Sequence, residues 1–274
     1  MTTLKAGSFK LDLTTPRIMA IINVTRDSFS GDGRISTDAA LRAAERALED
    51  GAEILDIGGE SSRPGALPVS EQEELDRVIP VVEALGGAGI PLSIDTVKPA
   101  VMRESIRAGA AIINDIAGFR MPGALEAVAN TNAALCVMHM QGEPQTMQQA
   151  PAYQDVVTEV VDFLAERLKV LGEAGVPPER LILDPGFGFG KTLEHNLAML
   201  NALERFRVDG LPVLVGMSRK TMLGAITGRP VGERVVAGAA AALVAMQNGA
   251  RIIRTHDVAP TRDVIRLWAA LVRD

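Results

Sequence analysis

Residues 17–23 read Arg-Ile-Met-Ala-Ile-Ile-Asn, an aliphatic run that ends at an amide side chain. Short runs of this kind are typical of buried parallel strands, whereas half-exposed antiparallel strands alternate apolar and polar residues. The pattern recurs along the chain and predicts eight strands, at 17–23, 52–58, 91–95, 110–115, 134–139, 181–184, 212–217 and 250–256.

Helical patterns separate these runs. Ser70 and Glu73 form a capping-box pattern that opens one helix, and the other helices are predicted at 38–50, 99–108, 123–129, 153–173, 193–203, 232–247 and 258–271. Repeated strand-then-helix units over about 250 residues favour an α/β fold of the (β/α)8 TIM-barrel type. An open doubly wound sheet is the alternative, because periodicity alone does not distinguish an open sheet from a closed one.

The predicted barrel domain spans residues 16–274 and leaves a short N-terminal segment, residues 1–15. Apolar and polar residues alternate from Phe9 to Leu13. This alternation predicts a short β-hairpin that closes the bottom of the barrel. The low aromatic content, 3%, means that aliphatic residues and Met must fill the core.

Composition excludes several classes of protein. The 28 basic and 34 acidic residues leave a net charge of −6, which argues against a broad nucleic-acid surface. A single cysteine, Cys136, excludes a disulfide framework and a cysteine-built zinc site. No signal-peptide pattern or membrane-spanning run is evident, so we expect a cytoplasmic protein that acts on small molecules.

The predicted strands end at residues that can bind ligands. Asp95, Asn114 and Asp184 stand at strand ends, and Lys220, Arg254 and His256 follow the last two strands. Active sites of such barrels lie at the C-terminal ends of the strands. Helix N-capping explains individual Ser, Thr or Asp residues, but it does not explain the whole set. Carboxylates and an amide on one side, with cations on the other, predict a ligand with a hydrogen-bonding ring and an anionic tail.

The residue types suggest how such a ligand is held. Asp and Asn match the edge of an amino-heterocycle, and Lys and Arg match phosphate oxygens. Asn23 offers a hard oxygen ligand for a Mg²⁺ held partly by diphosphate. Residues 186–191, Gly-Phe-Gly-Phe-Gly-Lys, lack the spacing of a phosphate-binding P-loop. We expect instead that these glycines let the backbone approach a flat ligand, which Phe189 covers.

The strand ends resemble those of the dihydropteroate synthase family. The resemblance runs from about residue 16 to the C-terminus and rests on eight blocks, at 18–30, 56–65, 93–96, 113–115, 137–142, 184–192, 216–220 and 254–258. The blocks occur in the family's order, and together they are highly specific. Arg26 departs from the usual Pro and Ser62 from the common Thr, but neither change removes a charged group.

This resemblance implies a barrel enzyme of folate biosynthesis. Such an enzyme joins 4-aminobenzoate to (7,8-dihydropterin-6-yl)methyl diphosphate, gives 7,8-dihydropteroate and diphosphate, and is inhibited by sulfonamides that compete with aminobenzoate. The family uses Mg²⁺ and is usually dimeric. The Ala-rich helix at 235–246, together with Trp268, offers apolar surface for a homodimer.

The resemblance also implies roles for individual residues. It assigns the pterin ring to Asp95, Asn114, Asp184 and Lys220, with Met138 and Phe189 lining the pocket. It assigns the diphosphate to Arg254, His256, Ser62 and Arg63, and Mg²⁺ to Asn23. It assigns the aminobenzoate to Phe29, Ser62, Arg63, Pro64, Ser218 and Lys220. Gly216 is a further expected substrate contact, and the catalytic set would be Arg63, Lys220, Arg254 and His256.

Two other functions are compatible with part of this pattern. A pterin barrel that transfers a methyl group from a methyl-folate to a corrinoid partner would share Asp95, Asn114 and Asp184. It would not need the loop with Ser62 and Arg63, nor the cationic set. A non-catalytic pterin-binding protein would be expected to have lost residues such as Asn23 or Arg63, which are present here.

Overall fold

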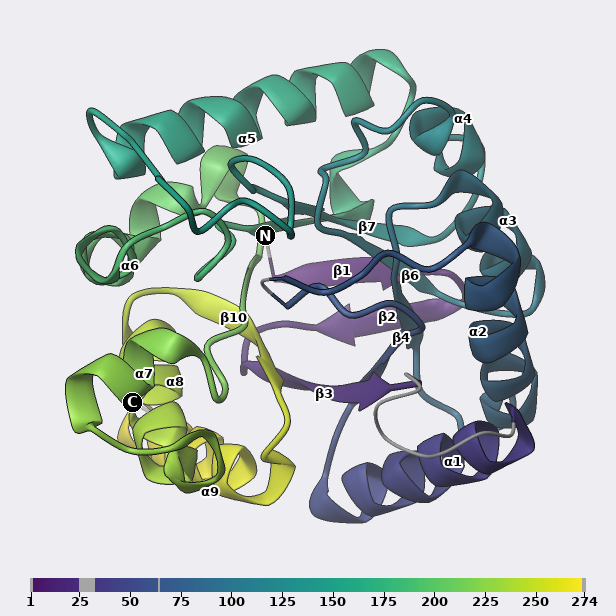
Figure 1. The fold of residues 1–274 in the computed structure, drawn as a ribbon, viewed down its shortest axis with the longest axis horizontal. Coiled ribbons are helices and arrows are strands. Elements are labelled where there is room, and N and C mark those ends of the chain that lie inside the picture. The colour runs from purple at the N-terminus through teal and green to yellow at the C-terminus, as the bar shows by residue number, and fades with distance from the viewer. Residues whose placement is uncertain (1, 25–32, 64, 273–274) are drawn as a thin grey trace.

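The computed structural model describes residues 2–24, 33–63 and 65–272, with the backbone alone for residues 33–36. Its parallel strands close into a barrel in the order β10-β3-β4-β5-β6-β7-β8-β9, with helices packed around them (Figure 1). The strands are β3 (Arg17–Asn23), β4 (Ile54–Gly58), β5 (Leu92–Asp95), β6 (Ile112–Asp115), β7 (Ala134–Met138), β8 (Leu181–Asp184), β9 (Val213–Val215) and β10 (Ala250–Thr255). Closure confirms the predicted barrel and rules out the open sheet.

Most of the helices lie where the sequence predicts them. They are α1 (Gly33–Asp50), α2 (Glu71–Leu85), α3 (Pro99–Arg107), α4 (Ala124–Val128), α5 (Val156–Glu173), α6 (Leu193–Asn201), α7 (Thr221–Thr227), α8 (Val235–Gln247) and α9 (Val258–Leu271). At α2, Ser70 Oγ accepts the N–H of Glu73 at 3.1 Å, as the capping pattern predicts. The short helix α7 was not predicted, since it holds a glycine in its middle and has no side-chain N-cap.

The two faces of each strand pack into different parts of the core. One face joins a large cluster with the surrounding helices and includes Leu55, Ile113 and Leu183. The other face joins a smaller cluster, which includes Ile54 and Ile112. Because side chains alternate along a strand, the smaller cluster is the inside of the barrel.

An antiparallel hairpin at the N-terminus fills one end of this interior. Strands β1 (Thr3–Ala6) and β2 (Phe9–Asp12) pair with each other, as expected from the alternating pattern (Figure 1). Leu4, Ala6 and Leu13 are buried in the interior cluster. The hairpin therefore covers the end of the barrel where the strands begin. In the described part of the chain, no helix is long and apolar enough to cross a membrane.

Candidate active site

The interior of the barrel changes from apolar to polar along each strand. On three strands, Ile54, Ile112 and Ile182 pack in the interior cluster, and a polar residue follows two positions later. Since residues two apart share a face, these polar residues also face inward. They and their counterparts on other strands are Asp56, Asp95, Asn114, Asp184 and Arg254. The strands therefore gather the predicted polar residues at one end of the barrel.

Arg254 lies at the centre of this group. Its Nε donates to Asp56 Oδ2 at 2.6 Å and its Nη2 donates to Asp95 Oδ2 at 2.7 Å. Asn114 Nδ2 donates to the same Asp56 oxygen at 3.3 Å. Asp95, a predicted pterin contact, is thus paired directly with Arg254, a predicted diphosphate contact, and Asn114 is linked to Arg254 through Asp56.

Burial makes this cluster electrostatically sensitive. It raises the pKa of Asp95 to about 7, with Arg254 opposing the shift. Burial also acts to lower the pKa of Arg254, but Asp56 and Asp95 outweigh it and the pKa is raised. Asp56 Oδ1 and Asn114 Oδ1 are buried acceptors without a hydrogen-bond partner among the described residues. Such acceptors suit a ligand that carries N–H donors.

Asp184 and Lys220 form the second charged group. Burial raises the pKa of Asp184, whose Oδ1 accepts the N–H of Gly186 at 2.7 Å. Burial lowers the pKa of Lys220 to about 8, opposed by Asp184. Lys220 Nζ donates to the carbonyl of Phe187 and lies 4.6 Å from the centre of the Phe189 ring. Phe189 also packs at the edge of a small buried cluster with Met138.

Two of the three glycines after β8 are required by packing within the chain, and Gly188, between them, lies beside the Lys220 side chain. A Cβ at Gly186 would lie 1.9 Å from the carbonyl oxygen of His139, and a Cβ at Gly190 would lie 2.4 Å from that of Gln141. The space beside these glycines is therefore occupied by the segment that follows β7. The loop is packed against its own chain at both positions, and Gly188 and Phe189 are the part-exposed residues between them.

Lys191 binds the same loop through two of its backbone carbonyls. It was not among the predicted site residues. Its Nζ donates to the carbonyls of Gly186 and Phe189, at 3.0 Å each, and lies 3.0 Å from His139 Nδ1. Burial lowers the pKa of Lys191 to about 7 and that of His139 to about 3. His139 is therefore neutral near pH 7, so its Nδ1 can accept a hydrogen bond from Lys191 Nζ.

His256 and Ser218 lie together after β10 and β9. Ser218 Oγ lies 3.1 Å from His256 Nδ1 and accepts the backbone N–H of His256 at 3.2 Å. Burial lowers the pKa of His256 to about 4, and the nearby cations Arg219, Arg254 and Arg63 lower it further. His256 is thus a neutral imidazole near pH 7, whereas the sequence analysis grouped it with the cations.

The remaining predicted residues lie in three places. Asn23 is exposed at the end of β3 and pairs with Gly58 of β4. A Cβ on Gly216 would lie 3.6 Å from Cβ of Arg254, so this glycine borders the Arg254 stem. Ser62 and Arg63 lie on the loop between β4 and α2. Phe29 and Pro64 lie outside the described residues.

Asp56 is the main residue that sequence reasoning missed. It is fully buried in the middle of β4, where the guanidinium of Arg254 and the amide of Asn114 bond to it. Its signal was available, because it has the same parity as Ile54 and is a carboxylate within an aliphatic run. Lys191 gave no comparable signal, since it follows a loop rather than a strand.

Comparison with known proteins agrees with this geometry. Residues 19–256 match the model of the family described as "Pterin binding enzyme". The dihydropteroate synthase of Haemophilus influenzae is 49% identical over 269 residues, which cover 97% of this chain and 98% of the relative. The barrel and the site together therefore define a pterin-binding enzyme of the TIM-barrel class.

Solved structures narrow the class. The dihydropteroate synthase of Burkholderia cenocepacia, in complex with 7,8-dihydropteroate, is 54% identical and superposes with a TM-score of 0.91, covering 98% of this chain and 96% of that one. The Xanthomonas albilineans enzyme with 4-aminobenzoic acid is 47% identical, with a TM-score of 0.92 and 98% coverage of both chains. The chain belongs to the dihydropteroate synthase family.

Proposed function

We propose that this chain condenses (7,8-dihydropterin-6-yl)methyl diphosphate with 4-aminobenzoate to give 7,8-dihydropteroate and diphosphate. The observation that carries the proposal is the convergence of Asp56, Asp95, Asn114, Asp184 and Arg254 at one end of the barrel interior. A family relative binds the product of this reaction and another binds the amine substrate.

The pterin ring is the part of the substrate that the inward polar residues suit. Its amino and ring N–H groups can donate to the buried acceptors Asp56 Oδ1 and Asn114 Oδ1 and to the carboxylate of Asp184. A site built of buried polar atoms rejects rings that lack the matching groups, because its own atoms would be left unpaired. Lys220 over Phe189, with Met138 in the same region, would border the ring plane.

The chemical step breaks a C–O bond and forms a C–N bond. The C–O electron pair leaves with the diphosphate, the amine lone pair bonds to the methylene carbon, and the amine nitrogen then loses a proton. Arg254 and Arg63 would stabilise the charge that grows on the leaving group, and neutral His256 can donate a hydrogen bond to it. The buried carboxylates of Asp95 and Asp184 would stabilise positive charge that develops on the pterin.

Mg²⁺ belongs to this proposal through Asn23. Among the described residues, no group of three or more His, Cys, Asp or Glu side chains is placed to hold a metal ion. Mg²⁺ needs no such group when diphosphate and water supply most of its ligands, and the exposed amide of Asn23 at the end of β3 fits that arrangement. When bound, the ion would neutralise charge on the diphosphate oxygens.

We also propose a homodimer and a cytoplasmic location. Ile226, Val236, Leu267 and Leu271 on α7, α8 and α9 are large apolar side chains that are at least half exposed. Trp268 is buried and its ring lies against Arg251, so it does not supply the dimer surface expected from the sequence. Light scattering of the purified protein tests the dimer, and cell fractionation tests the location.

The decisive experiment mixes the purified protein with the pterin diphosphate, 4-aminobenzoate and Mg²⁺. We expect release of diphosphate together with 7,8-dihydropteroate, identified by mass. Omission of 4-aminobenzoate must abolish the pteroate product. If no product depends on 4-aminobenzoate, the proposal is wrong.

A further inference from the structure

The loop between β4 and α2 is closed at its base. Glu60 is the second residue of the loop, and its Oε2 accepts the N–H of Val69 near the other end at 3.4 Å. Ser62 and Arg63 lie between these two anchor residues. Glu60 is therefore one of the anchors that place both side chains.

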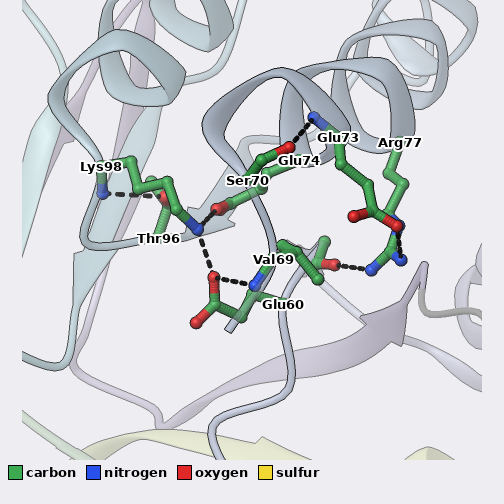
Figure 2. A network of polar contacts seen from close by, with 9 residues as sticks. Glu60, Val69, Ser70, Glu73, Glu74, Arg77, Thr96 and Lys98 are labelled. Carbon is green, nitrogen blue, oxygen red and sulfur yellow. Dashed lines mark hydrogen bonds and ion pairs between the residues drawn. The ribbon is translucent and has the colours of Figure 1, made fainter. Parts of the chain in front are cut away.

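Lys98, which lies between β5 and α3, holds Glu60. Its Nζ bonds Glu60 Oε2 and also Glu74 Oε2 on α2, as Figure 2 shows. The backbone N–H of Lys98 donates to Thr96 Oγ1 at 3.1 Å, so the turn after β5 fixes the start of the lysine side chain. Asp95 ends β5, so the short segment from Asp95 to Lys98 carries both a predicted pterin contact and the residue that supports the loop between β4 and α2.

The helix α2 completes the support. A Cβ on Gly59 would lie 2.8 Å from Val78 Cγ2 and 3.0 Å from Glu74 Cγ, so the chain passes directly against α2 at the start of the loop. Arg77 Nη1 donates to the Gly59 carbonyl at 2.6 Å, and Arg77 Nη2 pairs with Glu73 at 2.6 Å (Figure 2). The base of the loop is thus held by both α2 and Lys98.

Lys98 is the cation that neutralises both Glu60 and Glu74. Glu74 is 1% exposed, and burial raises its pKa while Lys98 opposes the shift. Burial acts to lower the pKa of Lys98, but Glu60 and Glu74 outweigh it and the pKa is raised. Removing the ammonium would leave two carboxylates facing each other, one of them buried, with no cation between them.

We propose that Lys98 is a positioning residue for the amine substrate: by binding Glu60, it holds Ser62 and Arg63 in place relative to the strand that ends at Asp95. This inference rests on the proposed function. Lys98 need not touch either substrate. Its effect falls on the loop and leaves the pterin ring contacts on β5, β6 and β8 in place.

Two substitutions test this role. Lys98→Met removes both ion pairs. Glu60→Gln removes only the ion pair between Lys98 and Glu60 and leaves the pair between Lys98 and Glu74. We expect each to raise the KM for 4-aminobenzoate by about tenfold or more, because small misplacements of positioning groups are costly. The affinity for 6-hydroxymethyl-7,8-dihydropterin, which lacks the diphosphate, should stay unchanged. Lys98→Arg should restore most of the wild-type KM.

A matched control removes a similar carboxylate at the other end of the barrel. Glu53 is half-buried, pairs with Arg17 and accepts the N–H of Ile18 at 3.3 Å. Glu53→Gln should leave the KM for 4-aminobenzoate at the wild-type value. Amide hydrogen exchange at Val69 adds a measurement that does not depend on activity: exchange should accelerate in K98M and E60Q but not in E53Q.

The double variant K98M/E74Q separates the positioning role of Lys98 from a general loss of stability. It removes the buried charge of Glu74 together with its partner Lys98. If its KM stays raised and Val69 still exchanges fast, the positioning role stands. If both return to wild type, the effect of K98M was general destabilisation and the inference is wrong. The inference is also wrong if the wild type is active and E60Q has the same KM for 4-aminobenzoate. Absence of any pteroate product from wild type would instead overturn the proposed function.

Discussion

Nη2 of Arg254 lies 2.7 Å from Oδ2 of Asp95, so a residue expected to bind the diphosphate is paired with one expected to bind the pterin ring. The same guanidinium is paired with Asp56. Both halves of the proposed substrate therefore meet groups that already have partners within the protein. These pairs leave Asp56 Oδ1 and Asn114 Oδ1 as open acceptors among the described residues, so a pterin ring can bind there while the ion pairs of Arg254 stay in place.

The first prediction concerns pH and Asp95. Its pKa is about 7 in the folded protein and near 3.8 in the unfolded chain, so the unfolded chain loses this proton first as the pH rises. Stability from the protonated carboxyl is thus present below about pH 4 and is lost by about pH 7. The melting temperature of the wild type should fall between about pH 4.5 and about pH 7.5, and Asp95→Asn should make this fall smaller. An equal slope in both proteins would refute the raised pKa.

The second prediction concerns Arg254 and Asp56. Arg254→Ala should lower the free energy of unfolding by about 3–5 kcal/mol, because it leaves the buried Asp56 carboxylate without a cation. The double variant R254M/D56N should recover much of this loss, because it removes both charges. Denaturant titrations at neutral pH measure both changes. A single variant as stable as wild type would contradict the prediction.

The third prediction concerns Asp184 and Lys220. Asp184→Asn and Lys220→Ala should each weaken binding of the pterin diphosphate by about 2–5 kcal/mol, since each removes one member of a buried charged group. Titration calorimetry measures the affinity. Lys169→Ala is the control, because Lys169 is exposed on α5 and should leave the affinity unchanged. Full affinity in either site variant would count against the assigned pterin pocket.

The fourth prediction concerns Lys191. Lys191→Met should destabilise the protein by about 1–3 kcal/mol, because the carbonyls of Gly186 and Phe189 lose their donor. The pKa of Lys191 is about 7 when folded and 10.5 when unfolded. Its stability contribution is therefore full above pH 10.5 and is lost as the pH falls through 7, so the gap between wild type and K191M should widen from pH 7 to pH 10. A constant gap would contradict it.

The barrel and much of its site were predictable because they follow from local patterns. Each aliphatic run forms a strand, and its last polar residue reaches the common end of the barrel. Asp95, Asn114 and Asp184 were found in this way. Asp56 was missed because it stands within its run and not at the end, although its parity with Ile54 places it on the same inner face.

Contacts between distant segments could not be predicted from such patterns. Gly186 is required because the carbonyl of His139 occupies the space of its Cβ, and no local pattern shows that approach. The neutral state of His256 depends on burial, on Arg254 two residues before it, and on Arg219 and Arg63 from two other segments. The helix α7 depends in part on Arg234, whose guanidinium lies against Gly224 and bonds the carbonyls of Arg219 and Lys220.

The N-terminal hairpin affects the order in which the two substrates can bind. Leu4, Ala6 and Leu13 fill the end of the barrel where the strands begin, so substrates and products share the opposite opening. The inward residues that suit the pterin lie deeper in that opening than the loop with Ser62 and Arg63. An amine seated first would stand in the path of the pterin. We therefore expect the pterin diphosphate to bind before the amine, and a steady-state analysis that shows compulsory order would bear this out.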